Sequence, residues 1–328
     1  TTVGAWSVKK EGQFHGFSKP GPNEPRDYGG FYTQEEIKDI VLYAKKRYVT
    51  IVPEIEMPGH SRAALAAYPE LSCTGETQNV PGLWGIFDAI YCSKEESIRF
   101  LQDVLDEVLY LFPSEYIHIG GDECPKESWK RSEFCQKLIK EKGLKDEHGL
   151  QSYFIGRIEK YLNSKGRQII GWDEILEGGL APNATVMSWR GEKGGIEAAK
   201  EKHTVIMTPG GWMYFDHQQN KKEDSVTIGG YTTIQKVYSY EPLPKEMDPA
   251  DHKYVLGAQA NVWTEYMNNT AKAEYMVFPR MSALSEVLWT SKENKSWPSF
   301  EKKLLHEFKR YDNFKINYSK AYFNPENN

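Results

Sequence analysis

The sequence predicts an α/β fold built on parallel strands, and most specifically a (β/α)8 TIM barrel. Short apolar runs alternate along the chain with polar loops and amphipathic helical segments. The apolar runs are nearly continuous, which is typical of parallel strands that helices cover on both faces. The sequence lacks the Gly-rich phosphate turn of a dinucleotide-binding fold, so a closed barrel is favoured over an open doubly wound sheet.

The elements follow from this rhythm in chain order. Six segments are expected to contain strands, each followed by a loop: 49–60, 116–120, 166–172, 184–189, 203–208 and 254–263. Helices are expected at about 33–47, 93–112, 148–165, 194–202, 271–290 and 298–311. Thr33 and Glu36 have the spacing of a capping box for the first helix, and Ser93 is the expected cap of the second.

Six strands are two fewer than an eight-stranded barrel needs. Residues 1–30 are rich in Gly and Pro and read as a loop, and the connection at 173–183 is too short for a full helix. We therefore expect one barrel domain over 1–328 that lacks its first two strands. Its strands three to eight lie at about 49–263, its last helices reach about 311, and a tail covers 312–328.

Composition excludes several classes of function. The net charge is −5 and no basic block occurs, so nucleic acid is not an expected partner. No run of about 18 apolar residues is present, so no membrane span is expected. The chain opens on Thr1-Thr2-Val3, without an initiator Met or a signal peptide, and we expect it to be a processed piece of something longer.

The four cysteines leave two interpretations open. They do not form a CxxC pair, so a structural zinc site is not expected. Cys73 and Cys92 bracket a loop-like stretch and could form a disulfide, while four buried thiols are an equally reasonable alternative.

Chemically distinctive side chains follow the predicted strands, where a barrel gathers its chemistry. They are His60, Asp122, Glu123, Trp172, Trp189, Tyr214, Asp216, Trp263 and Glu265. Each alone has an ordinary explanation: a Trp packs in a core, and an Asp-Glu pair caps a helix. Together, aromatic rings beside carboxylates suit a sugar, which has apolar C–H faces and a rim of hydroxyls.

Asp122 and Glu123 pose a problem, because they are adjacent. An ordinary glycosidase needs two carboxylates across a bond, roughly 5–9.5 Å apart, whereas neighbours on an extended chain point to opposite sides. The two acids are therefore expected to have different tasks.

Six stretches, in order over about residues 49–290, carry a resemblance to a known family. They are EIEMPGHSRAALAAYPEL, HIGGDE, IGWDEIL, MSWRG, YFD and NVWTE. With them the chain resembles the catalytic domain of glycoside hydrolase family 20, the β-N-acetylhexosaminidases. Glu56 stands where that family usually has Asp, and we expect little consequence. The family also has two earlier strands, which agrees with the count of six.

The resemblance implies a retaining, exo-acting hydrolase that removes terminal non-reducing β-linked GlcNAc or GalNAc. The nucleophile would be the 2-acetamido oxygen of the substrate itself, an exception to the two-carboxylate rule. Glu123 would be the general acid and then the base. Asp122 would accept the amide N–H, and Tyr214 would orient the amide oxygen.

The resemblance also assigns the remaining residues. The expected sugar-binding set is Trp172, Trp189 and Trp263 around the acetamido methyl, Asp216 and Glu265 on outer hydroxyls, and His60 beside Glu123, with His118 in support. No metal or organic cofactor is expected. The expected partners are β-linked N-acetylhexosamine glycans, and an N-terminal accessory domain and a secreted, periplasmic or lysosomal-type location are further expectations.

Three alternatives stay open at this point. One is a family 20 enzyme that releases a disaccharide, such as a lacto-N-biosidase, which would need a wider pocket. Another is a glycan-binding barrel without activity, although the presence of both Asp122 and Glu123 argues against it. The third is a fragment that is inactive alone.

Overall fold

The structure, a computed structural model, describes residues 30–81, 85–221 and 227–323. The described chain falls into two compact units, one over residues 30–187 and one over 188–323. Each unit contains parallel strands and helices, as expected for an α/β chain. The loop predicted for the first thirty residues lies outside the described residues, apart from Gly30.

The sheet of the first unit consists of β1 (Tyr116–His118), β2 (Gln168–Trp172) and β3 (Thr185–Ser188), paired in parallel in that order. Ahead of β1 lies an extended segment at 53–57, whose Glu54 forms an isolated parallel bridge with His118. The amides of Ile55 and Met57 donate to the carbonyls of His118 and Ile119 over 2.9 and 3.0 Å. The strand expected within 49–60 is thus present only as this short pairing.

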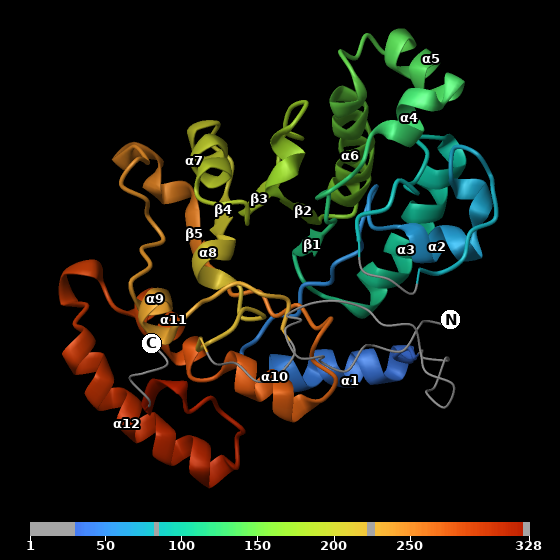
Figure 1. Cartoon of the computed structure of the whole chain (residues 1–328). Coiled ribbons are helices and arrows are strands. Elements are labelled where there is room, and N and C mark those ends of the chain that lie inside the picture. The colour runs from blue at the N-terminus through green and yellow to red at the C-terminus, as the bar shows by residue number, and fades with distance from the viewer. Residues whose placement is uncertain (1–29, 82–84, 222–226, 324–328) are drawn as a thin grey trace. The chain divides into compact units, whose positions relative to one another are not determined.

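Six helices of the described residues accompany this sheet. They are α1 (Gln34–Lys45), α2 (Arg62–Ala67), α3 (Glu95–Leu111), α4 (Glu127–Arg131), α5 (Glu133–Glu141) and α6 (Glu147–Ser164), with short 3-10 turns at Pro69–Leu71 and Asp173–Leu176. The buried faces of α3 and α6 are largely aliphatic. Helix α6 packs against β2 and against α3 (Figure 1). Leu101 and Leu105 of α3 and Ile158 of α6 are almost fully buried. Removal of this aliphatic surface from water is the main source of stability for such a layer.

One predicted cap is confirmed and one is wrong. Thr33 and Glu36 form a complete capping box at α1, with both reciprocal hydrogen bonds present. Ser93 does not cap α3, because the helix begins at Glu95 and Lys94 occupies the N-cap position. The Ser93 hydroxyl is instead buried without a hydrogen-bond partner among the described residues. Acidic side chains in the first turn favour this helix terminus through the helix dipole.

The second unit is built around β4 (Val205–Met207) and β5 (Val255–Ala258), which pair in parallel. Its helices are α7 (Lys193–Lys200), α8 (Gly210–Met213), α9 (Ile234–Tyr238), α10 (Thr270–Val277), α11 (Arg280–Trp289) and α12 (Trp297–Phe314), with 3-10 turns at Pro249–Tyr254, Lys292–Asn294 and Ala321–Phe323. The helix predicted over 271–290 is split into α10 and α11. Pro279 has no amide hydrogen and biases Phe278 to an extended conformation, which ends α10 at Val277.

The helices of the described residues were also compared with the length and apolarity that a membrane span requires. None of them meets both requirements.

The cysteine alternatives are resolved by a disulfide between Cys73 and Cys92, while Cys124 and Cys135 are free thiols. Cys135 is fully buried in a cluster with Ile90 and Trp129, and its Sγ lies 3.4 Å from the Sγ of Cys73. The disulfide therefore ties the two ends of the loop between α2 and α3 into a packed core.

We predict that replacing Cys73 and Cys92 together with Ala lowers the free energy of unfolding by about 3 kcal/mol, because the cross-link closes a loop with a sequence separation of 19 residues. Urea unfolding of the variant and of the oxidised parent measures this difference. Equal stability of the two proteins would contradict the prediction, and peptide mapping of the parent would show which cysteines are joined.

Candidate active site

Two turns emerge from neighbouring, paired segments of the first unit. Strand β1 runs directly into Gly120-Gly121-Asp122-Glu123, and the extended segment at 53–57 runs into Pro58-Gly59-His60. Because the two segments are parallel and hydrogen-bonded, their carboxyl ends meet at the same edge. The pairing thus brings His60 to the two acids.

The Gly-Gly sequence is required by the shape of the turn. Gly120 and Gly121 have φ values of 68° and 94°, a region that favours glycine. A Cβ on Gly120 would lie 1.8 Å from the carboxylate of Glu56, and a Cβ on Gly121 would lie 2.6 Å from Ile175. The Gly121 amide donates to Glu56 Oε1 over 2.9 Å, so the glycines allow the backbone to close onto this acid.

His60 is the contact that Asp122 and Glu123 share. Its Nε2 lies 3.5 Å from Asp122 Oδ2 and 3.3 Å from Glu123 Oε2. The two acids therefore share one partner, whereas neighbours on an extended chain would point to opposite sides. Glu123 has a φ of 44° and His60 one of 46°, so neither residue is extended. Such conformations are rare for residues other than glycine and often occur at functional sites.

The two carboxylates hold His60 in its charged form. Hydrogen bonds to Asp122 and then to Glu123 raise the pKa of His60 from 6.5 to about 10, against the opposing effect of burial. Because the pKa of His60 is raised in the folded state, its contacts with the two carboxylates stabilise the fold. This stabilisation is complete below about pH 6.5 and is lost as the pH rises through 10. Asp122 Oδ1 is buried and has no partner among the described residues, so it can accept a further hydrogen bond.

A second cluster lies beside this turn. Trp172 Nε1 donates to Glu54 Oε1 over 2.9 Å, and His118 Nδ1 lies 3.3 Å from the same oxygen. The rings of His118 and Trp172 are 4.7 Å apart. Burial lowers the pKa of His118 to about 4, so it is neutral, and its Nδ1 accepts the Gly120 amide over 3.0 Å. His118 and Glu54 therefore hold the Trp172 ring and the glycine turn together.

Sequence reasoning gave neither Glu54 nor Glu56 a role at the site, and it expected little consequence from Glu56. Burial, and then the nearby charge of Asp122, raise the pKa of Glu56 well above its ordinary value, and desolvation raises the pKa of Glu54. Alternate residues of an extended segment lie on one face. The spacing of two residues between Glu54 and Glu56 therefore indicates, from the sequence alone, that both acids face the same side. Glu56 packs into the Gly-Gly turn. The position at which this chain has Glu and the family usually has Asp is therefore part of the site.

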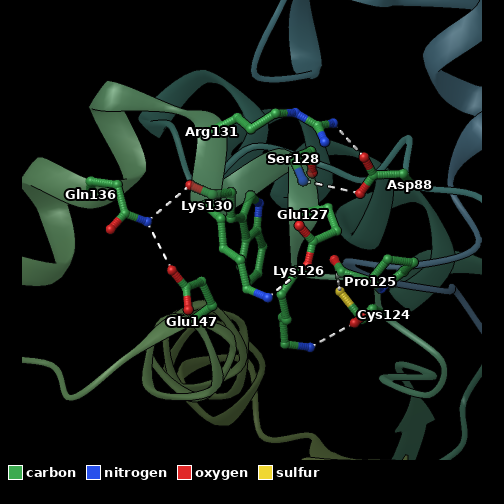
Figure 2. Close-up of polar contacts among 11 residues, drawn as sticks. Asp88, Cys124, Pro125, Lys126, Glu127, Ser128, Lys130, Arg131, Gln136 and Glu147 are labelled. Carbon is green, nitrogen blue, oxygen red and sulfur yellow. Dashed lines mark hydrogen bonds and ion pairs between the residues drawn. The ribbon is translucent and has the colours of Figure 1, made fainter.

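The segment after the acids is held by side chains from two other parts of the chain, the loop at residue 88 and helix α5. Asp88 accepts from the Ser128 amide, over 3.0 Å, and from the Arg131 guanidinium; Figure 2 draws both contacts. On the other side, the Gln136 side chain donates to the Trp129 carbonyl over 3.1 Å. These bonds keep the start of α4 in place and so restrain the turn that carries Glu123.

The predicted residues of the second unit gather around Tyr214. Its ring centroid lies 6.2 Å from that of Trp189 in a stacked arrangement and 6.5 Å from that of Trp263. Tyr214 forms a parallel bridge with Asn261, and the Phe215 amide donates to the Asn261 carbonyl over 2.8 Å. Three aromatic rings are thus assembled by backbone pairing within this unit.

Asp216 lies near Glu265 in the same unit. It is 5% exposed, and burial followed by the charge of Glu265 raises its pKa to about 7. The fully buried guanidinium of Arg280 fixes the surrounding backbone, with donations to the carbonyls of Phe215, His217 and Thr232. Each unit therefore presents its own group of predicted residues: His60, His118, Asp122, Glu123 and Trp172 in the first, and Trp189, Tyr214, Asp216, Trp263 and Glu265 in the second.

The donor atoms of His60, Asp122 and Glu123 lie within 4.8 Å of one another, which is a spacing that a metal ion could use. A metal would need the lone pair on His60 Nε2. Two carboxylates hold a proton at that atom up to about pH 10. A metal ion would therefore have to displace this proton.

Comparisons with known proteins identify the family of the chain. Residues 1–292 match the sequence profile described as the glycosyl hydrolase family 20 catalytic domain. A β-hexosaminidase of Porphyromonas gingivalis is 53% identical over 89% of this chain and 38% of its own length. A β-hexosaminidase of Vibrio furnissii is 39% identical over 79% of this chain and 43% of its own length. The chain thus spans less than half the length of these two relatives.

Solved structures are also similar. An exo β-N-acetylglucosaminidase from Vibrio harveyi, in complex with N-acetylglucosamine, has a TM-score of 0.81 at 33% identity over 92% of this chain and 48% of its own. A β-N-acetylhexosaminidase from Bacteroides fragilis has a TM-score of 0.77 at 32% identity over 90% and 60%. The solved relatives are (β/α)8 barrels, which confirms the predicted fold class.

We predict that Gly120→Ala is far more damaging than Gly143→Ala. Both glycines have a left-handed φ, 68° and 63°, which costs an alanine about 1–2 kcal/mol. Only at Gly120 does the new Cβ also meet the Glu56 carboxylate, which adds roughly 1–3 kcal/mol of overpacking. Urea unfolding of both variants measures the difference, and equal losses would show that the contact with Glu56 is unimportant.

Proposed function

The chain belongs to glycosyl hydrolase family 20, and we propose that it supplies the catalytic residues of an exo-acting β-N-acetylhexosaminidase. The substrates are glycans with a terminal, non-reducing, β-linked GlcNAc or GalNAc. The reaction retains the anomeric configuration and uses the substrate's own 2-acetamido group as nucleophile. The observation that carries this proposal is the shared contact of Asp122 and Glu123 with His60 Nε2.

That contact argues against two carboxylates acting from opposite faces of the bond. Asp122 and Glu123 are adjacent in one turn and share one hydrogen-bond partner. They cannot flank a glycosidic bond as the acid and nucleophile of an ordinary retaining glycosidase do. A nucleophile from the substrate removes the need for a second carboxylate, and a tethered nucleophile reaches effective molarities of roughly 10⁵–10⁸ M.

In the first step, Glu123 donates its proton to the glycosidic oxygen as the bond to the anomeric carbon breaks. The acetamido oxygen forms a new bond to the same carbon, giving a cyclic oxazolinium, and the leaving sugar departs as an alcohol. Asp122 accepts the amide N–H through Oδ1, which has no other partner among the described residues. Its negative charge stabilises the positive charge that develops on the ring.

In the second step, Glu123 takes a proton from water while the water oxygen attacks the anomeric carbon. The bond to the acetamido oxygen breaks, the amide is restored, and the product keeps the β configuration. Glu123 is again protonated for the next cycle. His60 holds its proton throughout, and its charge offsets the repulsion between the two neighbouring carboxylates.

The residues of the second unit, together with Trp172, have the sugar-binding roles. Trp172, Trp189 and Trp263 pack on the acetamido methyl and the sugar face, and Tyr214 donates to the amide oxygen. Asp216 and Glu265 bind outer hydroxyls. The gathering of Trp189 and Trp263 around Tyr214, and the nearness of Asp216 to Glu265, support these roles.

Three broader expectations belong to the same proposal. Residues 1–328 act as one catalytic domain, and an N-terminal accessory domain accompanies it in the whole protein. The protein works in a secreted, periplasmic or lysosomal-type compartment. The disulfide between Cys73 and Cys92 supports such a location, since disulfides persist in oxidising compartments.

We predict that Glu123→Gln, in catalytically active protein, lowers kcat/KM for unactivated β-GlcNAc disaccharides by about 10²–10⁴-fold, because the leaving sugar then departs without a proton. Aryl glycosides with acidic leaving groups should lose much less in the glycosylation step. Glu127→Gln, a charge-matched change in the exposed acid that begins α4, is the control. An equal loss on both substrate types in pre-steady-state measurements would refute the role of Glu123 as general acid.

A further inference from the structure

We propose that Cys73, Cys92 and Cys135 form a binding site for a thiophilic metal ion, such as zinc, when the disulfide is reduced. In the structure the first two cysteines are joined and the third is a free thiol. The disulfide and the metal ion are therefore alternative states of one cluster of three sulfurs. This inference goes beyond the proposed function, and it uses none of the residues to which the proposed reaction gives a role.

The sulfur atoms are close to the spacing that metal ligands have. Cys135 Sγ lies 3.4 Å from Cys73 Sγ and 3.7 Å from Cys92 Sγ, and the three atoms lie within 4.8 Å of one another. Zinc binds a thiolate sulfur at about 2.3 Å, so three such sulfurs around one ion stand about 3.7–4.0 Å apart. Once the bond between Cys73 and Cys92 is reduced, a small outward movement of these two side chains produces that triangle.

The fold, and not a local motif, brings the three ligands together. Cys73 lies two residues after Leu71, which ends a 3-10 turn, Cys92 lies just before α3, and Cys135 lies in the first turn of α5. The Cys135 amide donates to Ser132 Oγ over 3.3 Å, and the Cys92 amide donates to the Leu71 carbonyl over 2.9 Å. The backbone at two of the ligands is thus held by bonds that do not involve the disulfide.

Polar groups around Cys135 suit a thiolate that binds a metal. Burial raises the pKa of the Cys135 thiol, and hydrogen bonds with the Ser132 side chain and the Ser93 backbone oppose this shift. Donors of this kind, placed around a ligating sulfur, orient and tune metal ligands. The Ser93 hydroxyl is also buried and has no hydrogen-bond partner among the described residues. It is therefore available as one more donor beside the cluster.

Cys73 provides the entry path for the ion. Cys92 and Cys135 are fully buried, whereas Cys73 is half-buried and lines a pocket of about 320 Å³ within the same unit. An ion that enters from this pocket meets Cys73 first and then reaches the two buried sulfurs. A water molecule from the pocket takes the fourth position of a tetrahedral ion, which three protein ligands leave open.

Oxidation and metal binding exclude each other. A small-molecule disulfide is the oxidant: it accepts two electrons and becomes two thiols, while a bond forms between the sulfurs of Cys73 and Cys92. These sulfurs then cease to be thiolate ligands, the ion leaves, and Cys135 takes up a proton. A dithiol reverses the step, because it is oxidised to its own disulfide as the protein bond breaks. The ion then displaces the thiol protons.

The test adds zinc or cadmium to the full chain, either oxidised or reduced by a dithiol that is then removed. We expect the reduced protein to bind one ion and to show the ultraviolet charge-transfer absorption of cadmium thiolates. X-ray absorption of the zinc form should show three sulfurs at about 2.3 Å. The oxidised protein should show neither signal. Carboxylates and imidazoles produce neither, so an ion at His60, Asp122 and Glu123 does not imitate this result.

Cys135→Ser should raise the Kd of the reduced protein for zinc by at least about 100-fold, because one thiolate ligand is lost while the other two remain. Cys124→Ser is the matched control, since Cys124 is the free thiol outside the cluster, and its Kd should equal that of the parent. Zinc should also raise the urea midpoint of the reduced parent, and restore its fold if reduction alone unfolds it, without changing the oxidised protein.

Two or fewer sulfurs around zinc in the reduced parent would overturn the proposal, and this measurement decides the matter if Cys135→Ser does not fold. Equal affinity of Cys135→Ser and the parent would also overturn it, because Cys135 would then not be a ligand. So would binding of equal strength before and after reduction. Hydrolysis of β-linked GlcNAc by the oxidised protein tests the proposed function separately, so either proposal can fail without the other.

Discussion

One protonated histidine between two neighbouring carboxylates is the interaction on which the site of the first unit depends. Asp122 and Glu123 follow each other in the chain, and without a cation between them their charges would repel. His60 supplies that cation, and it arrives from a different segment. The contact forms only if the segment at 53–57 and β1 are paired in the correct register. The parallel pairing that builds the sheet is therefore the same constraint that assembles the site.

Crowding of acids is the cost of this arrangement. Glu54 and Glu56 lie within electrostatic reach of Asp122, and partial burial makes their charged forms less favourable. Left-handed backbone conformations at His60 and Glu123 add strain. Packing of the surrounding aliphatic core and the bonds around α4 offset these costs. A site that stores strain and desolvated charge in this way is pre-organised for a developing positive charge.

The sequence predicted the features that depend on local chemistry. The capping box of Thr33 and Glu36 was predictable because its two residues are only three positions apart in the sequence. The ends of the strands were predictable from the ends of the apolar runs. The fold class followed from the spacing of those runs. The break at Pro279 was also visible in principle, since proline cannot continue a helix, but the amphipathic pattern on both sides hid it.

Other features depend on contacts that local patterns do not contain. Glu123 has a left-handed φ and its side chain contacts His60, so an extended chain was the wrong reference. The importance of Glu56 depends on Gly120, which lies more than sixty positions away in the sequence. Ser93 has the right chemistry for a cap, yet α3 begins two residues later. In each case the outcome depends on the three-dimensional structure and not on the local sequence pattern.

An NMR titration of the histidine side chains tests this account most directly. In protein with labelled histidine, and with the His60 signal identified by loss in His60→Gln, the imidazole of His60 should stay doubly protonated through neutral pH and lose its proton only near pH 10. His118, buried and neutral, should show no protonation until about pH 4. A His60 that titrates at or below the ordinary value of 6.5 would show that it does not bridge the two carboxylates as a cation, and the account would be wrong.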